Sequence, residues 1–318
     1  MKSMESTRYN EFDYTASVAR SRVIETRLLS HLDFEKLLTA DSVPDAIVFL
    51  ANAGWKTFDD YNKMLYNQTF ELFELSVKLG AEGFLKTQRL KYDYHNLKAL
   101  IKTELTAQKQ HDILIDLGNI SLKDMKNAVL NADYKLFSEN MAMSVPEAYE
   151  QYAKTPDAQL VDLIFDNAYF KDLADFIKIQ PDEKTLDLIK TQIDMHNIKT
   201  FMRIRKMGKT YEFSKKVIAH GGWLPYEFYI ERVGSSDTDF LIFEKTPYSA
   251  LFLEEDLERS LDNYFIQKVK KARKGPFGLA PLAAYFFLKE NEIQNVRIIL
   301  TCKTAGMDEN IIRKRLRG

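Results

Sequence analysis

One stretch of this sequence occurs three times, and this recurrence constrains the fold more than any other feature. The copies are YDYHNLKALIKTEL, IDMHNIKTFMRIRK and NEIQNVRIILTCKT, at residues 92–105, 193–206 and 291–304. Aligned on Asn96, Asn197 and Asn295, they lie roughly 100 residues apart, about a third of the 318 residues. A period of this length corresponds to a whole domain. The sequence therefore predicts three similar domains in tandem, at residues 1–118, 119–220 and 221–318.

Each copy has the periodicity of an α-helix with one buried face. An aliphatic residue follows the asparagine, and further apolar residues stand three and four positions later, on the same side of a helix. The predicted buried positions are Leu97, Leu100 and Ile101, then Ile198, Phe201 and Met202, then Val296, Ile299 and Leu300. Glycine and proline number only 12 and 8, and we find no alternating strand pattern bounded by tight turns. The predicted fold class is all-α.

A second similarity supports the repeat. Asp166, Asn167, Tyr169 and Phe170 precede the second copy at nearly the distance at which Asp262, Asn263, Tyr264 and Phe265 precede the third. The latter group lies in a long charged helix that we predict from Leu251 to Arg273. The first boundary falls near Gly118-Asn119, where Ser121 heads a helix. The second falls at Gly221-Gly222, the strongest break in the sequence.

The polar positions of the copies allow two interpretations. They are Asp93, His95 and Asn96, then Asp194, His196 and Asn197, then Glu292, Gln294 and Asn295. Carboxylate and imidazole groups of the first two copies are able to bind a divalent metal or transfer protons. The third copy lacks histidine, and no His-x3-His or Cys-x2-Cys pair stands nearby. We therefore predict helix capping and inter-helix hydrogen bonds, with no catalytic residue, metal site or cofactor.

Met207-Gly208-Lys209-Thr210 contains the end of a phosphate-binding P-loop. That motif requires a glycine five residues before Gly208, where this sequence has Arg203 on a predicted helix. Without the glycine-rich backbone that surrounds a phosphate, nucleotide binding is not predicted here.

The formal net charge of −1 excludes a molecule-wide attraction to nucleic acid or to acidic membranes. One basic run stands out, made of Lys268, Lys270, Lys271, Arg273 and Lys274. It fits a solvated helix end favoured by the helix dipole, and it also fits a surface that binds an acidic partner. The N-terminus has no apolar signal segment, and the most apolar run, 280–288, is too short to span a bilayer. The single cysteine, Cys302, fits a reducing cytoplasm.

Several segments together resemble the C subunit of archaeal and bacterial V/A-type rotary ATPases, which is related to the d subunit of eukaryotic V-ATPases. They are ARSRVIETRLLS at residues 19–30, the Tyr-x-His-Asn-Leu-Lys helix of the first copy, Gly221-Gly222, and NVRIILTCKTAGM at residues 295–307. The resemblance spans nearly the whole chain.

The resemblance implies a non-catalytic component of the central stalk, in which three helical domains form a funnel around a pseudo-threefold axis. Its implied partners are the central shaft of the ATP-hydrolysing head and the membrane proteolipid ring, with no nucleic acid. Its implied role is to couple the two during proton or sodium transport. Its implied location is the cytoplasmic face of the membrane, held there through the complex and without a transmembrane segment of its own.

Two other classes remain open at the level of sequence. A general helical-repeat adaptor shares the helical content, although such repeats usually have periods of roughly 20–50 residues. A metal-dependent hydrolase that uses the Asp-x-His-Asn helices is the third candidate. The surfaces of the three predicted domains look alike in the sequence, which leaves the docking residues open.

Overall fold

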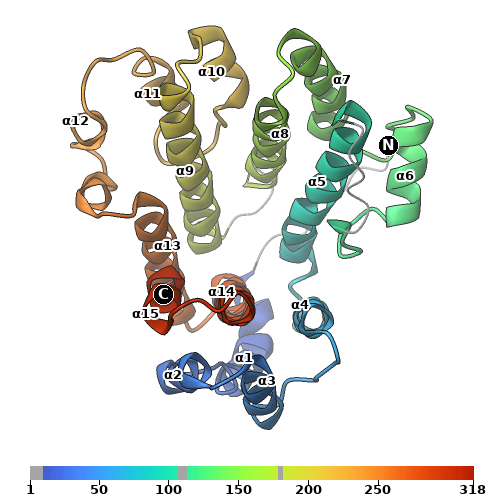
Figure 1. Ribbon diagram of the computed structural model, residues 1–318, viewed down its shortest axis with the longest axis vertical. Coiled ribbons are helices and arrows are strands. Elements are labelled where there is room, and N and C mark those ends of the chain that lie inside the picture. Colours follow the sequence, from blue (N-terminus) through green and yellow to red (C-terminus); the bar gives the residue numbers. More distant parts are fainter. Residues whose placement is uncertain (1–9, 107–112, 178–181) are drawn as a thin grey trace. The chain divides into compact units, whose positions relative to one another are not determined.

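The computed structural model describes residues 10–106, 113–177 and 182–318, and every regular element in these ranges is helical (Figure 1). The predicted all-α class is confirmed for this part of the chain. Contacts between Cα atoms divide the chain into two compact units, Met1–Glu82 with Asp256–Gly318, and Gly83–Glu255. The predicted division into three domains follows the sequence repeat instead of contact density, and it stays a prediction. Residues 1–9, on which the predicted lack of a signal segment depends, lie outside the described residues.

The first unit joins the two ends of the chain around one apolar helix. Its helices are η1 (Glu11–Tyr14), α1 (Thr15–Glu25), α2 (His31–Thr39), α3 (Val43–Asn52), α4 (Tyr61–Lys78), α13 (Leu257–Arg273), α14 (Ala280–Thr304) and α15 (Glu309–Arg315). Helix α14 packs against α1, α3, α4, α13 and α15. Every residue of its apolar run, 280–288, is buried. A helix that is apolar on all sides belongs in a core, and this run forms the core of the first unit.

The second unit contains the other two repeat helices. Its helices are α5 (Glu82–Thr106), α6 (Leu122–Leu130), α7 (Glu139–Lys154), α8 (Ala158–Ile177), α9 (Glu183–Lys206), α10 (Tyr211–Val217), α11 (Tyr226–Ile230), α12 (Asp239–Phe243) and η3 (Ser249–Leu253). One core cluster joins α5, α6, α7 and α8 around Leu97 and Phe165. A second joins α8 and α9 around Leu173 and Ile193. Helix α6 begins as predicted, because Ser121 Oγ accepts the Asp124 N–H.

The three sequence copies form α5, α9 and α14, and their predicted apolar stripes are buried. Eight of the nine predicted positions are buried, while Met202 is half-buried. The basic residue after each aliphatic position lies off this face and is half-exposed. Lys98, for example, reaches Asp166 on α8 with an Nζ to Oδ1 distance of 2.7 Å. The repeat therefore encodes the same packed helix three times.

The predicted start of the long charged helix at Leu251 is wrong. Leu251 lies in the 3-10 helix η3, and α13 begins only at Leu257. The Asp256 carboxylate accepts the N–H of Arg259 and caps the helix there. The helix begins after Asp256 because the backbone of this N-cap residue is extended and not helical.

Candidate functional site

The asparagine of each copy holds a backbone segment that follows its helix. Its side-chain N–H donates to a backbone carbonyl, and its side-chain oxygen accepts the N–H of the same residue, at distances between 2.8 and 3.0 Å. The residues held in this way are Ile115, Ala219 and Arg317. An amide side chain matches a peptide group in both directions, which explains why asparagine recurs.

The acid three residues before each asparagine holds the next part of the segment. Asp93 accepts the N–H groups of Asn119 and Ile120 at 3.0 and 2.9 Å. Asp194 accepts those of Trp223 and Leu224, both at 3.1 Å. We call these segments the first joint (residues 115–120) and the second joint (residues 219–224). Burial raises the pKa of Asp93, and its hydrogen bonds oppose that shift.

Glycine is required where the first two joints pass the acids. A Cβ on Gly118 would lie 2.1 Å from Asp93 Oδ1, and one on Gly222 would lie 2.0 Å from Asp194 Oδ1. Both distances are far inside van der Waals contact. The Gly-Gly break of the sequence therefore marks a backbone that runs against a buried carboxylate.

The third joint is made of two separate segments. Asn295 holds Arg317, but the acid, Glu292, accepts the N–H of Leu29 at 2.6 Å. Glu292 also pairs with Lys289, with an Nζ to Oε1 distance of 2.5 Å. We use the name third joint for Arg317–Gly318 together with Leu28–Leu29. The N-terminal segment thus completes the last repeat, and burial raises the pKa of Glu292.

The two histidines of the copies bond backbone groups at equivalent positions. His95 Nε2 lies 2.8 Å from the carbonyl oxygen of Ile113, two residues before Ile115, which Asn96 holds. His196 bonds the backbone of Val217, at the equivalent place in the second joint, and stacks on Phe170 with ring centres 4.1 Å apart. Burial lowers the pKa of His196 to about 4. A neutral, stacked ring holds the segment in place.

The asparagines and acids of all three copies, and the histidines of the first two, form hydrogen bonds as predicted, but the predicted helix capping is wrong, because their partners are backbone groups of connecting segments. Within 10–106, 113–177 and 182–318, no group of three or more His, Cys, Asp or Glu side chains has the geometry of a metal site. Gly208 and Thr210 of the P-loop fragment lie at helix ends. Gly208, with φ of 59°, follows the end of α9, and Thr210 caps α10.

The second sequence similarity places equivalent residues on α8 and α13, each of which packs against its repeat helix. The Asn167 side-chain N–H donates to the carbonyl of Lys216. Asn263 Oδ1 instead accepts the N–H of Gly318 at 2.8 Å. Asn263 thus adds a hydrogen bond to the third joint, and Asn167 adds one to Lys216, three residues before the second joint.

The predicted basic run lies along the C-terminal half of α13 and its end. Lys271 and Lys274 are exposed, whereas Lys268, Lys270 and Arg273 are half-buried. The helix end is held by Arg22 of α1, which donates to the carbonyl oxygens of Arg273 and Gly275 at 2.5 and 2.8 Å. Sequence reasoning did not assign this role. Its only signal was that Arg22 belongs to the ARSRVIETRLLS segment.

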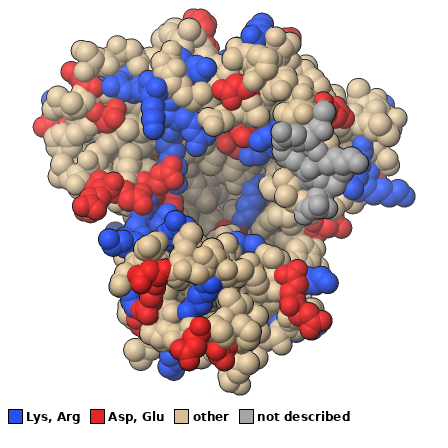
Figure 2. Space-filling view, viewed as in Figure 1, with Lys and Arg blue, Asp and Glu red and all other residues tan. Residues whose placement is uncertain are grey.

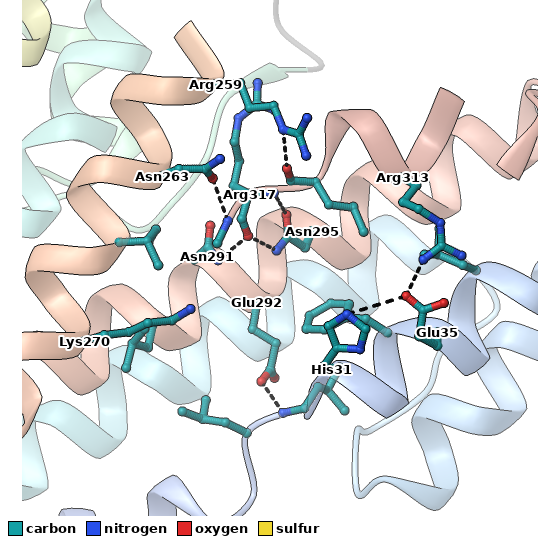
Figure 3. Close-up of a pocket in the computed structure, with 18 of the residues that line it drawn as sticks. His31, Glu35, Arg259, Asn263, Lys270, Asn291, Glu292, Asn295, Arg313 and Arg317 are labelled. Atoms are coloured by element: carbon teal, nitrogen blue, oxygen red, sulfur yellow. Dashed lines mark hydrogen bonds and ion pairs between the residues drawn. The ribbon is translucent and has the colours of Figure 1, made fainter. Parts of the chain in front are cut away.

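A cavity of about 520 Å³ opens beside the third joint (Figure 3). Of the basic run, Lys270 and Arg273 line it, together with Arg259, Arg313 and Arg317. Figure 3 shows Arg259 and Lys270 of α13, Arg313 of α15 and Arg317 of the C-terminal segment. It also shows Glu292 of α14 and, from the N-terminal part, His31 and Glu35. Sequence reasoning missed this cavity, because its wall comes from both ends of the chain.

The charges that line the cavity are only partly neutralised. Arg313 pairs with Glu35, and Arg317 Nε lies 2.9 Å from Asp262 Oδ2. Arg259 Nε donates to the carbonyl of Leu316 at 3.3 Å. Within the described part of the chain, we find no ion pair for the three remaining cationic groups. They are Arg259, Lys270 and Arg273. The cavity therefore has an excess of positive charge.

Figure 2 shows both basic and acidic side chains spread over one face of the molecule. Among the described residues, no helix combines the length and the apolar character that crossing a bilayer requires.

Comparison with known proteins supplies the family. Residues 17–315 match the family described as ATP synthase (C/AC39) subunit. The chain is 24% identical to the V-type sodium ATPase C subunit of Enterococcus hirae, over 92% of this chain and 94% of the relative. It is 23% identical to the A-type ATP synthase C subunit of Thermococcus kodakarensis, over 95% and 89%. It is 25% identical to that of Methanosphaera stadtmanae, over 93% and 85%. The chain therefore belongs to the ATP synthase (C/AC39) subunit family.

Proposed function

We propose that this chain is a non-catalytic central-stalk component of a V/A-type ATPase. In this role it couples the central shaft of the ATP-hydrolysing head to the membrane proteolipid ring during proton or sodium transport. The observation that carries the proposal is the family match over residues 17–315, with relatives named as C subunits aligned over most of their own length.

The arrangement we propose is a funnel of three similar domains, 1–118, 119–220 and 221–318, around a pseudo-threefold axis. The three joints support it. In each repeat helix the asparagine holds a residue near the end of its own domain, and the acid holds residues of another domain. The third repeat helix holds Leu29, at the start of the first domain. A closed threefold repeat requires this return to the beginning.

Transmission of torque requires a body that does not yield when twisted. Close-packed helices meet this requirement, since their cores have few voids into which side chains can move. The joints add hydrogen bonds at the points where one domain continues into the next. Two docking interfaces of at least roughly 800 Å² per partner would hold such a body against rotation.

The proposed location is the cytoplasmic face of the membrane, where the chain is held by the other subunits. For the basic run of α13, we propose that Lys268, Lys270, Lys271, Arg273 and Lys274 face an acidic surface of one of these subunits. Charges at the rim of an interface mainly guide association and fix orientation.

The test is to purify the tagged chain from its native cell membranes, identify the proteins that accompany it, and assay ATPase activity. We expect head, shaft and proteolipid subunits in the eluate, ATPase activity in that eluate, and none from the isolated chain. Recovery of the chain alone or with unrelated partners would overturn the rotary role, as would ATP hydrolysis by the isolated chain.

A further inference from the structure

Four polar side chains that line the cavity of about 520 Å³ lie on one face of α13. They are Arg259, Asn263, Lys270 and Arg273, and Figure 3 shows the first three in order along the helix. Successive members stand four, seven and three residues apart, which is close to one, two and one turns of an α-helix. The cavity therefore meets one continuous row of polar groups.

The groups that this row leaves available are hydrogen-bond donors. Asn263 uses its side-chain oxygen for the N–H of Gly318 at 2.8 Å, which leaves its amide N–H groups as donors. Arg259 donates to a backbone carbonyl through Nε, and the terminal nitrogens of its guanidinium remain. Lys270 and Arg273 have no ion pair that we find within the described part of the chain. The row thus favours a ligand rich in acceptor atoms.

The two carboxylates that line the cavity are already paired. Glu35 pairs with Arg313, and Glu292 pairs with Lys289. The charges of the α13 row therefore call for an anion from outside the chain. Phosphate groups match this requirement, because each carries more charge and more acceptor oxygens than a carboxylate and binds well to guanidinium.

The spacing along α13 sets the length of the ligand. Lys270 and Arg273 are about one turn apart, so both side chains are able to bind the same phosphate chain. Arg259 stands 11 residues before Lys270, which is about 16 Å along the helix axis. A single phosphate ion is too small to contact both ends of this row. The ligand is therefore extended, with acceptor groups over much of its length.

The middle of the cavity is apolar. Ile266 lies on the same face of α13, between Asn263 and Lys270, and it is buried. Leu38 of α2 and Leu288 of α14 also line the cavity and are buried. Such a surface favours an organic group over a bare chain of phosphates, which would lose hydration there. The volume is within the range of about 300–1,000 Å³ that is typical of ligand pockets.

We propose that this cavity binds a soluble organic oligophosphate, of the chemical class of the nucleoside triphosphates. The phosphates lie at Lys270 and Arg273. The organic part packs on Ile266 and presents acceptor atoms to Asn263 and Arg259. A ligand held in this way contacts α2, α13 and α14 together, and it stabilises the folded first unit because it binds the folded chain.

The inference goes beyond the proposed function and does not depend on it. All the residues that line the cavity belong to the first unit. Lys271 and Lys274, the exposed members of the basic run, are not part of the lining. They stay available for docking to another subunit whether or not the cavity is filled.

The test is titration calorimetry of the isolated full-length chain, which is free of the nucleotide sites of an ATP-hydrolysing head. The probes are ATP and inorganic triphosphate, without added divalent metal, so that cationic side chains are the main counter-charges. We expect ATP to bind about tenfold more tightly than triphosphate, since only ATP has an organic part to bury. Absence of ATP binding would overturn the proposal, and so would equal or tighter binding of triphosphate.

Two matched substitutions locate the site. Lys270→Gln removes a charge that lines the cavity, and we expect it to weaken ATP binding about tenfold. Lys271→Gln removes the same charge from the exposed neighbour outside the lining and should leave the affinity unchanged. Urea-induced unfolding of the ligand-free variants checks that both are folded. Equal effects at the two positions would place the ligand elsewhere and contradict the assignment.

A lipid headgroup is the other source of the same phosphate chemistry, and vesicles distinguish it. The probes are vesicles of phosphatidylcholine with and without phosphatidylinositol 4,5-bisphosphate. We expect neither to displace ATP, because the proposed ligand is soluble and enters the cavity whole. Displacement by the phosphoinositide vesicles alone would identify a lipid headgroup as the ligand and overturn the proposal.

Discussion

At the scale of single residues, the three joints differ mainly in the acid and in the backbone that passes it. Asp93 and Asp194 are short, and each receives a backbone that comes close enough to exclude a Cβ. Glu292 is longer by one methylene group and receives a single N–H from Leu29. The pairing of aspartate with glycine is therefore a local steric requirement.

Gly222→Ala is expected to destabilise the chain by about 2 kcal/mol or more. The new Cβ would lie 2.0 Å from Asp194 Oδ1, so the joint must move away and leave buried polar groups without partners. Urea-induced unfolding measures the change. Gly234→Ala is the control, because no atom lies within 4 Å of its added Cβ, and it should change the free energy of unfolding by less than about 0.5 kcal/mol. Similar losses in both variants would show that the close approach is not the cause.

His196 is expected to make the stability of the chain depend on pH. Burial lowers its pKa from 6.5 to about 4, so the unfolded chain takes up the proton at higher pH than the folded chain. The free energy of unfolding therefore falls as the pH drops from about 6.5 towards about 4. The loss between pH 7.5 and pH 5 attributable to this one ring is about 2 kcal/mol.

The variant that tests this is His196→Gln, since Gln294 occupies the equivalent position in the third copy. Glutamine does not titrate, so unfolding in urea at the two pH values should show a smaller loss than in the unchanged chain. Parallel losses in both proteins would assign the pH dependence to other groups.

At the scale of helices, periodicity predicted the interior of the elements better than their ends. The stripes of α5, α9 and α14 followed from spacing alone. The start of α13 did not, because one carboxylate, that of Asp256, decides it. Helix α7 runs from Glu139 to Lys154 and contains Pro146 in its interior. Met141, Val145 and Ala148 bury one face of α7, and packing outweighs the lost backbone hydrogen bond.

The end of α13 depends on Arg22, and a conservative change should reveal it. Nη2 of Arg22 donates to both carbonyl oxygens while Nη1 pairs with Glu25 at 3.2 Å. Arg22→Lys keeps the charge but has a single nitrogen, which cannot hold both sites, and we expect a loss of about 1–2 kcal/mol. Hydrogen exchange should also become faster in the last turn of α13. Arg20→Lys is the matched control, since Arg20 is an exposed neighbour on the same helix. Equal stability of the two variants would contradict the capping role.

At the scale of the whole molecule, the helical class, the repeat and the family could be predicted from the sequence, because these depend on patterns within each segment. The third joint could not be predicted. Leu29 and Glu292 lie at opposite ends of the chain, and no spacing rule connects them. The cavity escaped prediction for the same reason, although Lys270 and Arg273 had been singled out as charges. Contacts between distant segments become visible only when the chain is folded.

Docking through the basic run is the prediction that belongs to the assembled complex. Lys271 and Lys274 are the exposed members, so reversing both to glutamate should replace attraction to an acidic partner by repulsion. We expect affinity for the remaining subunits to fall about tenfold, which corresponds to about 1.4 kcal/mol, in binding assays with complex depleted of this chain. The difference should shrink in high salt, where exposed charges are screened.

The control reverses Lys123 and Lys126, two exposed lysines of α6, and so makes the same change in net charge at another surface. If the run on α13 forms the docking surface, the control should retain most of the affinity in low salt. Equal losses would mean that net charge alone governs association. If neither variant loses affinity, the basic run is a solvated helix end, which is the simpler interpretation. Its cations then stabilise the C-terminal dipole of α13.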